Sequence, residues 1–404
     1  MAWNGPKWLS SWHNFASEVT NDFSFAERIS IADWTLEGDG EEMPGVVFTR
    51  DEKLDIARML DEVGVHRINA GWIASSLPED DRVVREIAHL GLNAKVEAEA
   101  AVSKSHIDSA LKADVSNVVM ESILTDVSIK SSHLSRNEVM DRSIEITTYA
   151  KEHGLQVTFG LVDAPRADQE FLSRFVRSLE REAKADIVCI SDSWGVTSPQ
   201  GFAHLIRMVR GFTRLPIAVH CHNDLGLATA NALAGLLAGA AIVTATVNGI
   251  GERCGLASLE EVAVALRILY NTDVGIKYDR LCELSRLVED ATGRMISKMK
   301  PVVGERAFAW EADQFVQNIR SLGAIGDVKS GLPYQPDFVG ADFRCYPAKR
   351  IGRAGIQWEA QRFGMKLTDE KAEELAARIR ELSKRKHQPS YQEFLMMISM
   401  MSKS

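Results

Sequence analysis

The sequence predicts a parallel (β/α)₈ barrel, an α/β TIM-barrel fold, followed by a smaller, mainly helical C-terminal region. Eight short runs rich in β-branched residues alternate with amphipathic segments, which is the pattern of repeated strand–helix units. This strand signal stops near residue 285. A doubly wound open sheet would show the same alternation, but no glycine-rich phosphate-binding fingerprint follows the first run, which disfavours that fold.

Each predicted strand is a short apolar run bounded by polar or glycine-containing turns. The runs are residues 28–34, 66–72, 93–100, 117–123, 155–162, 186–192, 216–224 and 241–250. Between them, segments such as 50–64 and 169–184 place apolar residues at helical spacing. Parallel strands with right-handed helical crossovers follow from this order.

Three regions are expected along the chain. Residues 1–24 form an N-terminal extension whose tryptophans are expected to cover an apolar patch, and residues 25–285 form the catalytic barrel. Residues 286–404 form C-terminal subdomains with a lid or dimerisation role. In that last region, "TDEKAEELAARIRELSKRK" predicts a helix with Thr368 as its N-cap and acids in its first turn.

Composition excludes several classes of function. The 404 residues are 45% hydrophobic and 25% charged, and no apolar run reaches the length of a membrane span. A net charge of −9 disfavours nucleic acid as the main partner. Five scattered cysteines without a CxxC motif favour a reducing, cytoplasmic location. We therefore expect a small-molecule substrate.

Two polar segments follow predicted strands at the carboxyl end of the barrel, where active sites of this fold lie. The first strand runs into an acidic turn that holds Asp33, Glu37, Asp39, Glu41 and Glu42. The seventh strand ends in "HCHND", in which the two histidines are two residues apart and point to the same side. Two imidazoles and a carboxylate from another strand form an open 2-His-1-carboxylate metal site.

These segments resemble the signature blocks of the metal-dependent DRE-TIM enzymes, which include isopropylmalate synthase, homocitrate synthase and hydroxymethylglutaryl-CoA lyase. The matching blocks are "DWTLEGDGEEMPG", "HCHNDLGLATAN" and "NGIGERCGLASLEEV". The segment "KPVVGERAFAWEAD…YQPDFVG" is similar to the subdomains of the synthase branch. The resemblance implies an acyl-CoA co-substrate, a divalent metal (Mn²⁺, Mg²⁺ or Zn²⁺) and a homodimer.

Carried over by position, the resemblance assigns the metal ligands to Asp39, His220 and His222, with Glu37 as a rival ligand. The chain departs from the family elsewhere. Glu37 or Gly38 replaces the arginine that precedes the metal carboxylate, with one residue inserted, and Asn69 replaces a glutamate. In later blocks, Ser193 stands where a threonine is usual, and Trp310 and Phe315 replace two histidines.

Two acids of the third predicted strand indicate which charge the substrate carries. Glu97 and Glu99 lie on one face, near where synthases offer an arginine, so the site would suit a neutral or amine-bearing substrate better than a dicarboxylate. Alternatively, both acids pair structurally with Lys95, Arg166 or Arg253.

The remaining candidates complete the predicted site. The catalytic candidates are Glu252, Arg253, Glu99 and Ser193, and the substrate-binding candidates are Glu37, Asn69, Glu97, Asp192 and Asn223. We expect a carbon–carbon bond enzyme that condenses an acyl-CoA with an altered 2-oxo acid. A metal-dependent lyase or hydrolase on the same scaffold is the alternative, and a non-catalytic regulator is disfavoured by the retained site residues.

Overall fold

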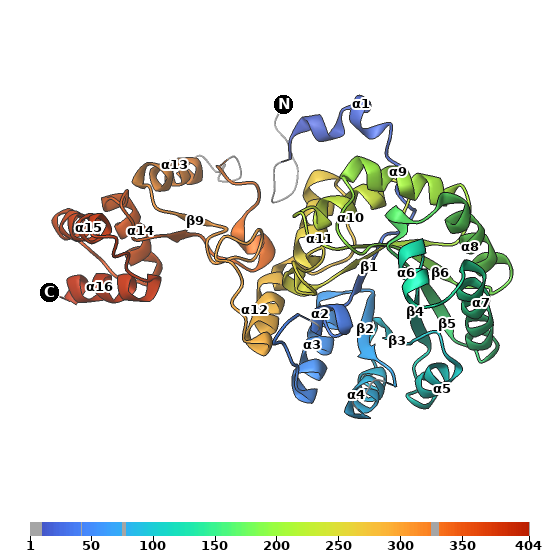
Figure 1. Ribbon diagram of the computed structural model, residues 1–404. Coiled ribbons are helices and arrows are strands. Elements are labelled where there is room, and N and C mark those ends of the chain that lie inside the picture. The colour runs from blue at the N-terminus through green and yellow to red at the C-terminus, as the bar shows by residue number, and fades with distance from the viewer. Residues whose placement is uncertain (1–9, 42, 75–77, 325–330, 404) are drawn as a thin grey trace. The chain divides into compact units, whose positions relative to one another are not determined.

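A closed eight-stranded parallel barrel forms the centre of the larger part of the molecule (Figure 1). The computed structural model describes residues 10–41, 43–74, 78–324 and 331–403. The strands are β1 Ser30–Asp33, β2 Arg67–Trp72, β3 Lys95–Glu99, β4 Asn117–Ile123, β5 Gln156–Val162, β6 Ile187–Asp192, β7 Ile217–Cys221 and β8 Ile242–Ala245. Each strand lies inside one of the predicted runs, so the predicted barrel is confirmed.

Helices follow the strands and surround the barrel. They are α2 Gly38–Glu41, α3 Arg50–Val63, α4 Pro78–Ala88, α5 Lys104–Lys112, α6 Asp126–Ser131, α7 Arg136–Glu152, η2 Ala164–Arg166, α8 Gln169–Arg181, α9 Pro199–Arg210, α10 Ala228–Leu237, η3 Val247–Gly249, α11 Leu259–Leu269, η4 Tyr278–Arg280 and α12 Leu281–Thr292. Local sequence explains their starts. In α3, Thr49 and Glu52 form a reciprocal capping box that satisfies two of the free N-terminal amides.

Strand register decides which side chains point into the barrel. In the register of β6 and β7, Cys189 is opposite Ala218 and Ser191 is opposite His220. Because side chains alternate along a strand, every second residue of each strand points into the barrel. Pairing of β8 with β1 closes the barrel, and there Thr244 is opposite Ala32. The lower interior is an apolar cluster of Ala32, Trp34, Val119, Ile187, Cys189, Ala218 and Ile242.

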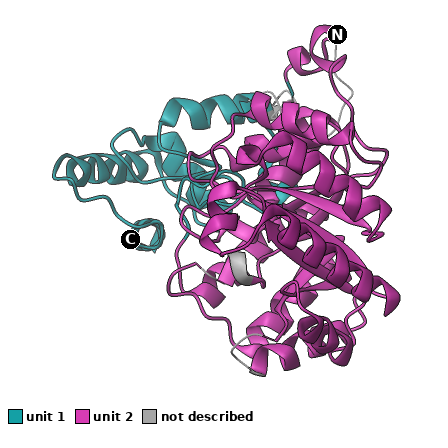
Figure 2. Cartoon of the chain, turned by 45° about the vertical axis from the view of Figure 1, so that its right-hand side comes forward, with its two compact units in different colours: residues 1–10, 296–404 teal, residues 11–295 magenta. Residues whose placement is uncertain are grey.

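The chain divides into two compact units, one of residues 11–295 and another made mainly of residues from Ile296 onward (Figure 2). The second unit contains β9 Ala309–Trp310, α13 Asp313–Ala324, η6 Pro336–Val339, β10 Arg344–Cys345, α14 Arg353–Arg362, α15 Asp369–Lys384 and α16 Tyr391–Lys403. Its expected helical character is confirmed, including the Thr368 N-cap, whose side chain accepts from the Lys371 amide. The small parallel sheet of β9 and β10 was not foreseen.

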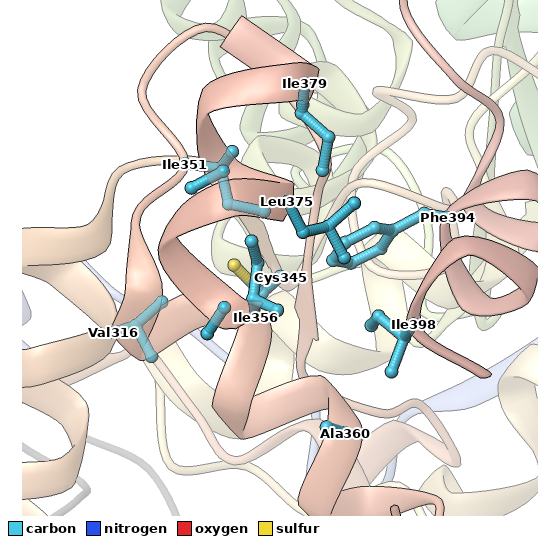
Figure 3. Close-up of a cluster of buried hydrophobic side chains, with 11 residues drawn as sticks. Val316, Cys345, Ile351, Ile356, Ala360, Leu375, Ile379, Phe394 and Ile398 are labelled. Atoms are coloured by element: carbon cyan, nitrogen blue, oxygen red, sulfur yellow. The ribbon is translucent and has the colours of Figure 1, made fainter. Parts of the chain in front are cut away.

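The second unit has an apolar core of its own. Figure 3 shows side chains from α13, β10, α14, α15 and α16 packed together, among them Val316, Cys345, Leu375 and Phe394. These four are at most 1% exposed. Burial of this kind is enough to hold the short helices together. The lid or dimerisation role of this unit stays a prediction.

The N-terminal extension begins with η1 Trp12–Phe15 and α1 Ser17–Thr20. Trp12 is 70% exposed in this chain, so the expectation that the tryptophans cover an apolar patch, on the barrel or on a partner chain, stays a prediction. Trp3 and Trp8 lie outside the described residues. The extension is anchored by Phe23 and Phe25, whose rings contact Tyr270 edge-on.

Candidate active site

His220 and His222 converge at the carboxyl end of β7. Both side chains are buried, and their Nε2 atoms lie 3.1 Å apart. Metal–nitrogen bonds are about 2.0–2.1 Å long, so two nitrogens on one ion are roughly 3 Å apart when the bond angle is near 90°. The pair therefore has the spacing needed to bind one divalent ion, as the predicted same-side orientation requires.

Thr244 of β8 fixes which nitrogen of His220 carries the proton. The Nδ1 atom of His220 lies 2.8 Å from Thr244 Oγ1, and the same hydroxyl lies 3.3 Å from the Val219 carbonyl, to which it donates. The hydroxyl oxygen then accepts from Nδ1–H, which leaves a lone pair on Nε2. Burial and the Arg253 charge lower the pKa of His220 to about 3, so the ring is the neutral form that binds metal.

The acidic turn packs directly onto the end of β1. Gly40 lies so close to the strand end that a Cβ there would be 2.3 Å from the Thr35 carbonyl oxygen. Asp33 is held by Thr35, because its two oxygens accept from the Thr35 amide and hydroxyl, each at 3.0 Å. Burial raises the pKa of the Asp33 carboxyl to about 7.

The other acids of this turn have different surroundings. Glu41 forms an ion pair of 2.6 Å with Lys53 of α3 and accepts from the Phe48 amide, so its role here is structural. Glu37 is buried at 3% exposure. Glu42 and the side chain of Asp39 lie outside the described residues, so the predicted carboxylate ligand stays a prediction. Among the described side chains, no cluster of three potential metal ligands is present.

Two predicted residues of β3, Glu97 and Glu99, are buried inside the barrel. Glu97 forms an ion pair of 2.6 Å with Arg67, a partner that was not among the three basic residues considered from sequence. The strand register brings them together, because Asn69 is opposite Glu97 and Arg67 lies two positions before Asn69, on the same face of β2. The charge of Glu97 is therefore neutralised by Arg67. Of the two acids that favoured a neutral or amine-bearing substrate, only Glu99 still supports it, and Glu99 is 3% exposed.

Asn69 lies beside the end of β1. Its Oδ1 atom accepts from the Gly71 amide at 3.3 Å, at a bulge in the pairing of β2 with β3. Gly71 has φ 127°, a value that favours glycine, and bulges of this kind are common near active sites. The Asn69 side chain is fully buried.

Arg253 is held at the rim of the barrel by four contacts. Its guanidinium donates to Asp224 at 2.8 Å, to Glu252 at 2.9 Å and to the Ser193 carbonyl at 2.7 Å. It also lies 4.9 Å from the centre of the Trp194 ring. The hydrogen bonds from Arg253 lower the pKa of Asp224. A cation is thus fixed near the histidines, and the predicted pair Glu252 and Arg253 is brought together with Ser193.

Three predicted polar residues are engaged in loop structure. Asp192 accepts from the amides of Val196 and Thr197, and Asn223 Oδ1 accepts from the Ala228 amide at the start of α10. The hydroxyl of Ser193 accepts from the Asp163 amide at 3.0 Å. These hydrogen bonds give all three a structural function in the loops, and their predicted roles toward the substrate stay predictions.

Sequence reasoning missed Thr244 and Trp34. Thr244 lies in an apolar strand run without a motif, and only its register opposite Ala32 could have placed it inside the barrel. Trp34 lies within the acidic segment, in which only the carboxylates were predicted to have a functional role. It is 1% exposed, and its ring centre is 4.9 Å from that of His220.

Comparison with known proteins gives matches over most of the chain. Residues 28–288 match the family model described as HMGL-like. Homocitrate synthase AksA of Methanothermobacter thermautotrophicus is 39% identical over 372 residues, or 92% of each chain. A probable 2-isopropylmalate synthase of Methanopyrus kandleri is 40% identical over 88% of this chain and 70% of its own. The (R)-citramalate synthase CimA of Methanocaldococcus jannaschii is 38% identical over 87% and 70%, respectively.

Solved structures share the barrel. The HMG-CoA lyase of Bacillus subtilis superposes with a TM-score of 0.61 at 17% identity, covering 67% of this chain and 96% of the lyase. The hydroxymethylglutaryl-CoA lyase of Pseudomonas aeruginosa gives 0.60 at 20% identity, covering 70% and 97%. At these identities the likeness shows the fold alone.

Proposed function

Because the chain belongs to the HMGL-like family, we propose that it is a divalent-metal-dependent enzyme that condenses an acyl-CoA with a 2-oxo acid. Relatives at 38–40% identity over most of the chain are homocitrate, isopropylmalate and citramalate synthases. The observation that carries the proposal is the convergence of two buried imidazoles at 3.1 Å, with the tautomer of one set by Thr244. That pair lies at the barrel end where enzymes of this fold act.

The metal site proposed here consists of His220, His222 and Asp39. The described donors fit a divalent ion, since two buried imidazoles are present at the required spacing and Gly40 packs the segment that carries Asp39 onto the strand end. Mn²⁺, Mg²⁺ and Zn²⁺ all accept such a mixed nitrogen and oxygen set. When bound, the ion would polarise the 2-oxo group of the substrate.

The remaining chemistry falls to groups of this chain. A condensation needs a base that removes a proton from the acyl group and a cation that stabilises the developing oxyanion. Glu99, buried on β3, is the proposed base, and Glu252 at the rim is the second candidate. Arg253, held by Asp224 and stacked near Trp194, supplies the fixed positive charge.

We also propose a homodimeric, cytoplasmic enzyme. The homodimer follows from the resemblance to the synthases. The reducing compartment is supported by the five cysteines, which are all free. Among the described residues, no helix has both the length and the apolar character required to cross a bilayer.

The reaction can be tested by thiol release. Purified protein with Mn²⁺ or Mg²⁺ is mixed with acetyl-CoA and a panel of 2-oxo acids, and free CoA thiol is measured with a thiol reagent. Release that depends on both substrates and on the metal is expected. A silent panel with metal bound would refute the condensation and favour the lyase or hydrolase alternative.

The metal site needs its own measurement. Calorimetric titration of Mn²⁺ into His222→Ala and Asp39→Ala is expected to show an affinity at least tenfold weaker than that of the unaltered protein. His153→Ala and Asp55→Ala are matched controls, because His153 is exposed at the C-cap of α7 and Asp55 is exposed on α3, both outside the barrel interior. Wild-type affinity in both site variants would exclude this ligand set.

A further inference from the structure

Two buried N–H donors, one directly after β1 and one within β2, have no acceptor within the described part of the chain. They are Nε1 of Trp34 and Nδ2 of Asn69. Their side chains are 1% and 0% exposed. A buried donor without an acceptor costs about 1–3 kcal/mol, so native proteins seldom keep one without a reason.

The two residues are neighbours across the β1–β2 ladder. Asp33 is opposite Ile68, so the next residues along the two strands are Trp34 and Asn69. The orientation of the Asn69 amide is fixed, because the Gly71 N–H requires the oxygen and therefore leaves the NH₂ group for another partner. Trp34 contacts His220, a proposed metal ligand, so its neighbour Asn69 also lies close to the proposed metal site.

The Trp34 ring also closes the barrel interior just below the histidines. It belongs to one buried cluster with Cys189, Ala218 and Ile242. Each of those residues lies two positions before a member of the next layer, which contains Ser191, His220 and Thr244. The indole is packed against His220 with an interplanar angle of 39°. A substrate next to the metal ligands therefore meets the indole as a floor.

We propose that Trp34 and Asn69 bind an oxygen of the substrate through these two N–H groups, and that the indole restricts the substrate to a short-chain 2-oxo acid. The inference rests on the proposed function, because it specifies the acid that this site accepts. A carbonyl or carboxylate oxygen is the partner that two neutral N–H donors require. The resemblance expects an arginine at position 37 or 38, where this chain has Glu37 or Gly38. The two N–H donors would replace the hydrogen bonds that such an arginine gives to the substrate. The filled barrel centre leaves little depth for a branched or long substituent.

Binding of 2-oxo acids to the Mn²⁺-saturated protein, measured by calorimetry, tests the inference. Pyruvate, 2-oxoisovalerate and 2-oxoglutarate are the probes, and pyruvate is expected to bind tightest to the unaltered chain. Trp34→Phe keeps the ring and removes the donor, so pyruvate binding should weaken roughly two- to tenfold. Asn69→Asp keeps the acceptor for Gly71 and replaces the donor with a charge, so it should weaken pyruvate binding further.

A second variant tests the floor. Trp34→Thr removes most of the indole and should improve 2-oxoisovalerate relative to pyruvate by roughly tenfold, about the value of the methylenes that the new space admits. Trp12→Phe is the control, since that tryptophan is exposed on the N-terminal extension. Its binding constants should equal those of the unaltered chain. Mn²⁺ titration of each variant ensures that only loaded protein is compared.

The outcomes separate this inference from the proposed reaction. Unchanged pyruvate binding in Trp34→Phe and Asn69→Asp, unchanged preference in Trp34→Thr, or no binding of any probe to the unaltered chain would overturn the inference. Weakened binding in the variants together with an absence of thiol release would support it and refute the condensation. Thiol release with binding constants unaffected by the substitutions would leave the reaction standing and reject the role of Trp34 and Asn69.

Discussion

The hydroxyl of Thr244 lies between the Nδ1 atom of His220, at 2.8 Å, and the carbonyl of Val219, at 3.3 Å. This relay orients the imidazole before any ligand binds. Thr244→Val keeps the shape and removes the relay, so Mn²⁺ affinity should fall about 10- to 100-fold, the usual cost of losing such a partner. Calorimetry provides the measurement. Thr158→Val, the same change on β5, should leave the affinity intact, and equal loss in both variants would point to general damage to the barrel.

The ion pair of Arg67 and Glu97 predicts a stability effect. Both side chains are less than 10% exposed, so Arg67→Leu leaves a buried carboxylate without its partner. The free energy of unfolding should fall by roughly 3–5 kcal/mol, as for other broken buried pairs. Urea denaturation measures this change.

The double variant Arg67→Leu with Glu97→Leu controls for the loss of packing. It should recover much of the stability, because no unpaired charge stays inside the barrel. Arg58→Leu, which breaks an exposed pair with Asp55 on α3, should cost less than about 1 kcal/mol. A double variant no more stable than Arg67→Leu would show that the pair contributes through packing instead of charge.

Asp33 predicts a pH dependence of stability. Its folded pKa of about 7 lies above the ordinary value of 3.8, so the folded chain binds a proton that the unfolded chain has released. This contribution is complete below about pH 4 and is lost as the pH rises through about 7. Asp33→Asn removes it, and the amide oxygen still accepts from the Thr35 amide.

Unfolding in urea at pH 5 and pH 8 tests the Asp33 prediction. The free energy of unfolding of the unaltered chain, relative to Asp33→Asn, should fall by about 2–3 kcal/mol between the two values. Other titrating groups are common to both proteins and cancel in the difference. Parallel pH profiles for the two proteins would contradict the raised pKa of Asp33.

Arg253 predicts an effect on catalysis without an effect on metal binding. Lysine keeps the charge but cannot hold Asp224, the Ser193 carbonyl and the Trp194 ring together. Arg253→Lys should therefore lower kcat/KM on the order of 100-fold if the cation stabilises the oxyanion. Arg58→Lys is the surface control. Wild-type kinetics in Arg253→Lys would assign the arginine a purely structural role.

The barrel was predictable because strand alternation and inward–outward periodicity are local properties of the sequence. The spacing of His220 and His222 likewise predicts that both side chains point to the same side of β7. Partners across strands were less accessible, since Thr244 and Arg67 carry no motif and become relevant only through register.

Residue type alone also did not indicate the structural contacts of some candidate residues. Asp192 and Asn223 have the side chains of ligand-binding residues, yet their oxygens accept from loop and helix amides. Carboxylates and amides are equally suited to both uses, so composition could not separate them. For Trp34, residue type indicated too small a role. A large apolar residue in an acidic segment carries no ligand-binding signal, and its contact with His220 is visible only in the structure.

The close approach of Gly40 to the Thr35 carbonyl limits how the acidic segment can vary. Trp34, Thr35 and Leu36 are buried upstream, so the chain is anchored on both sides of Glu37 to Asp39. If this segment holds the one inserted residue that the resemblance implies, that residue is accommodated within this short stretch. An alanine at position 40 would collide with the Thr35 carbonyl and would push the main chain of the turn outward. The carboxylate of Asp39 would then move with the main chain, although Asp39 itself is unchanged.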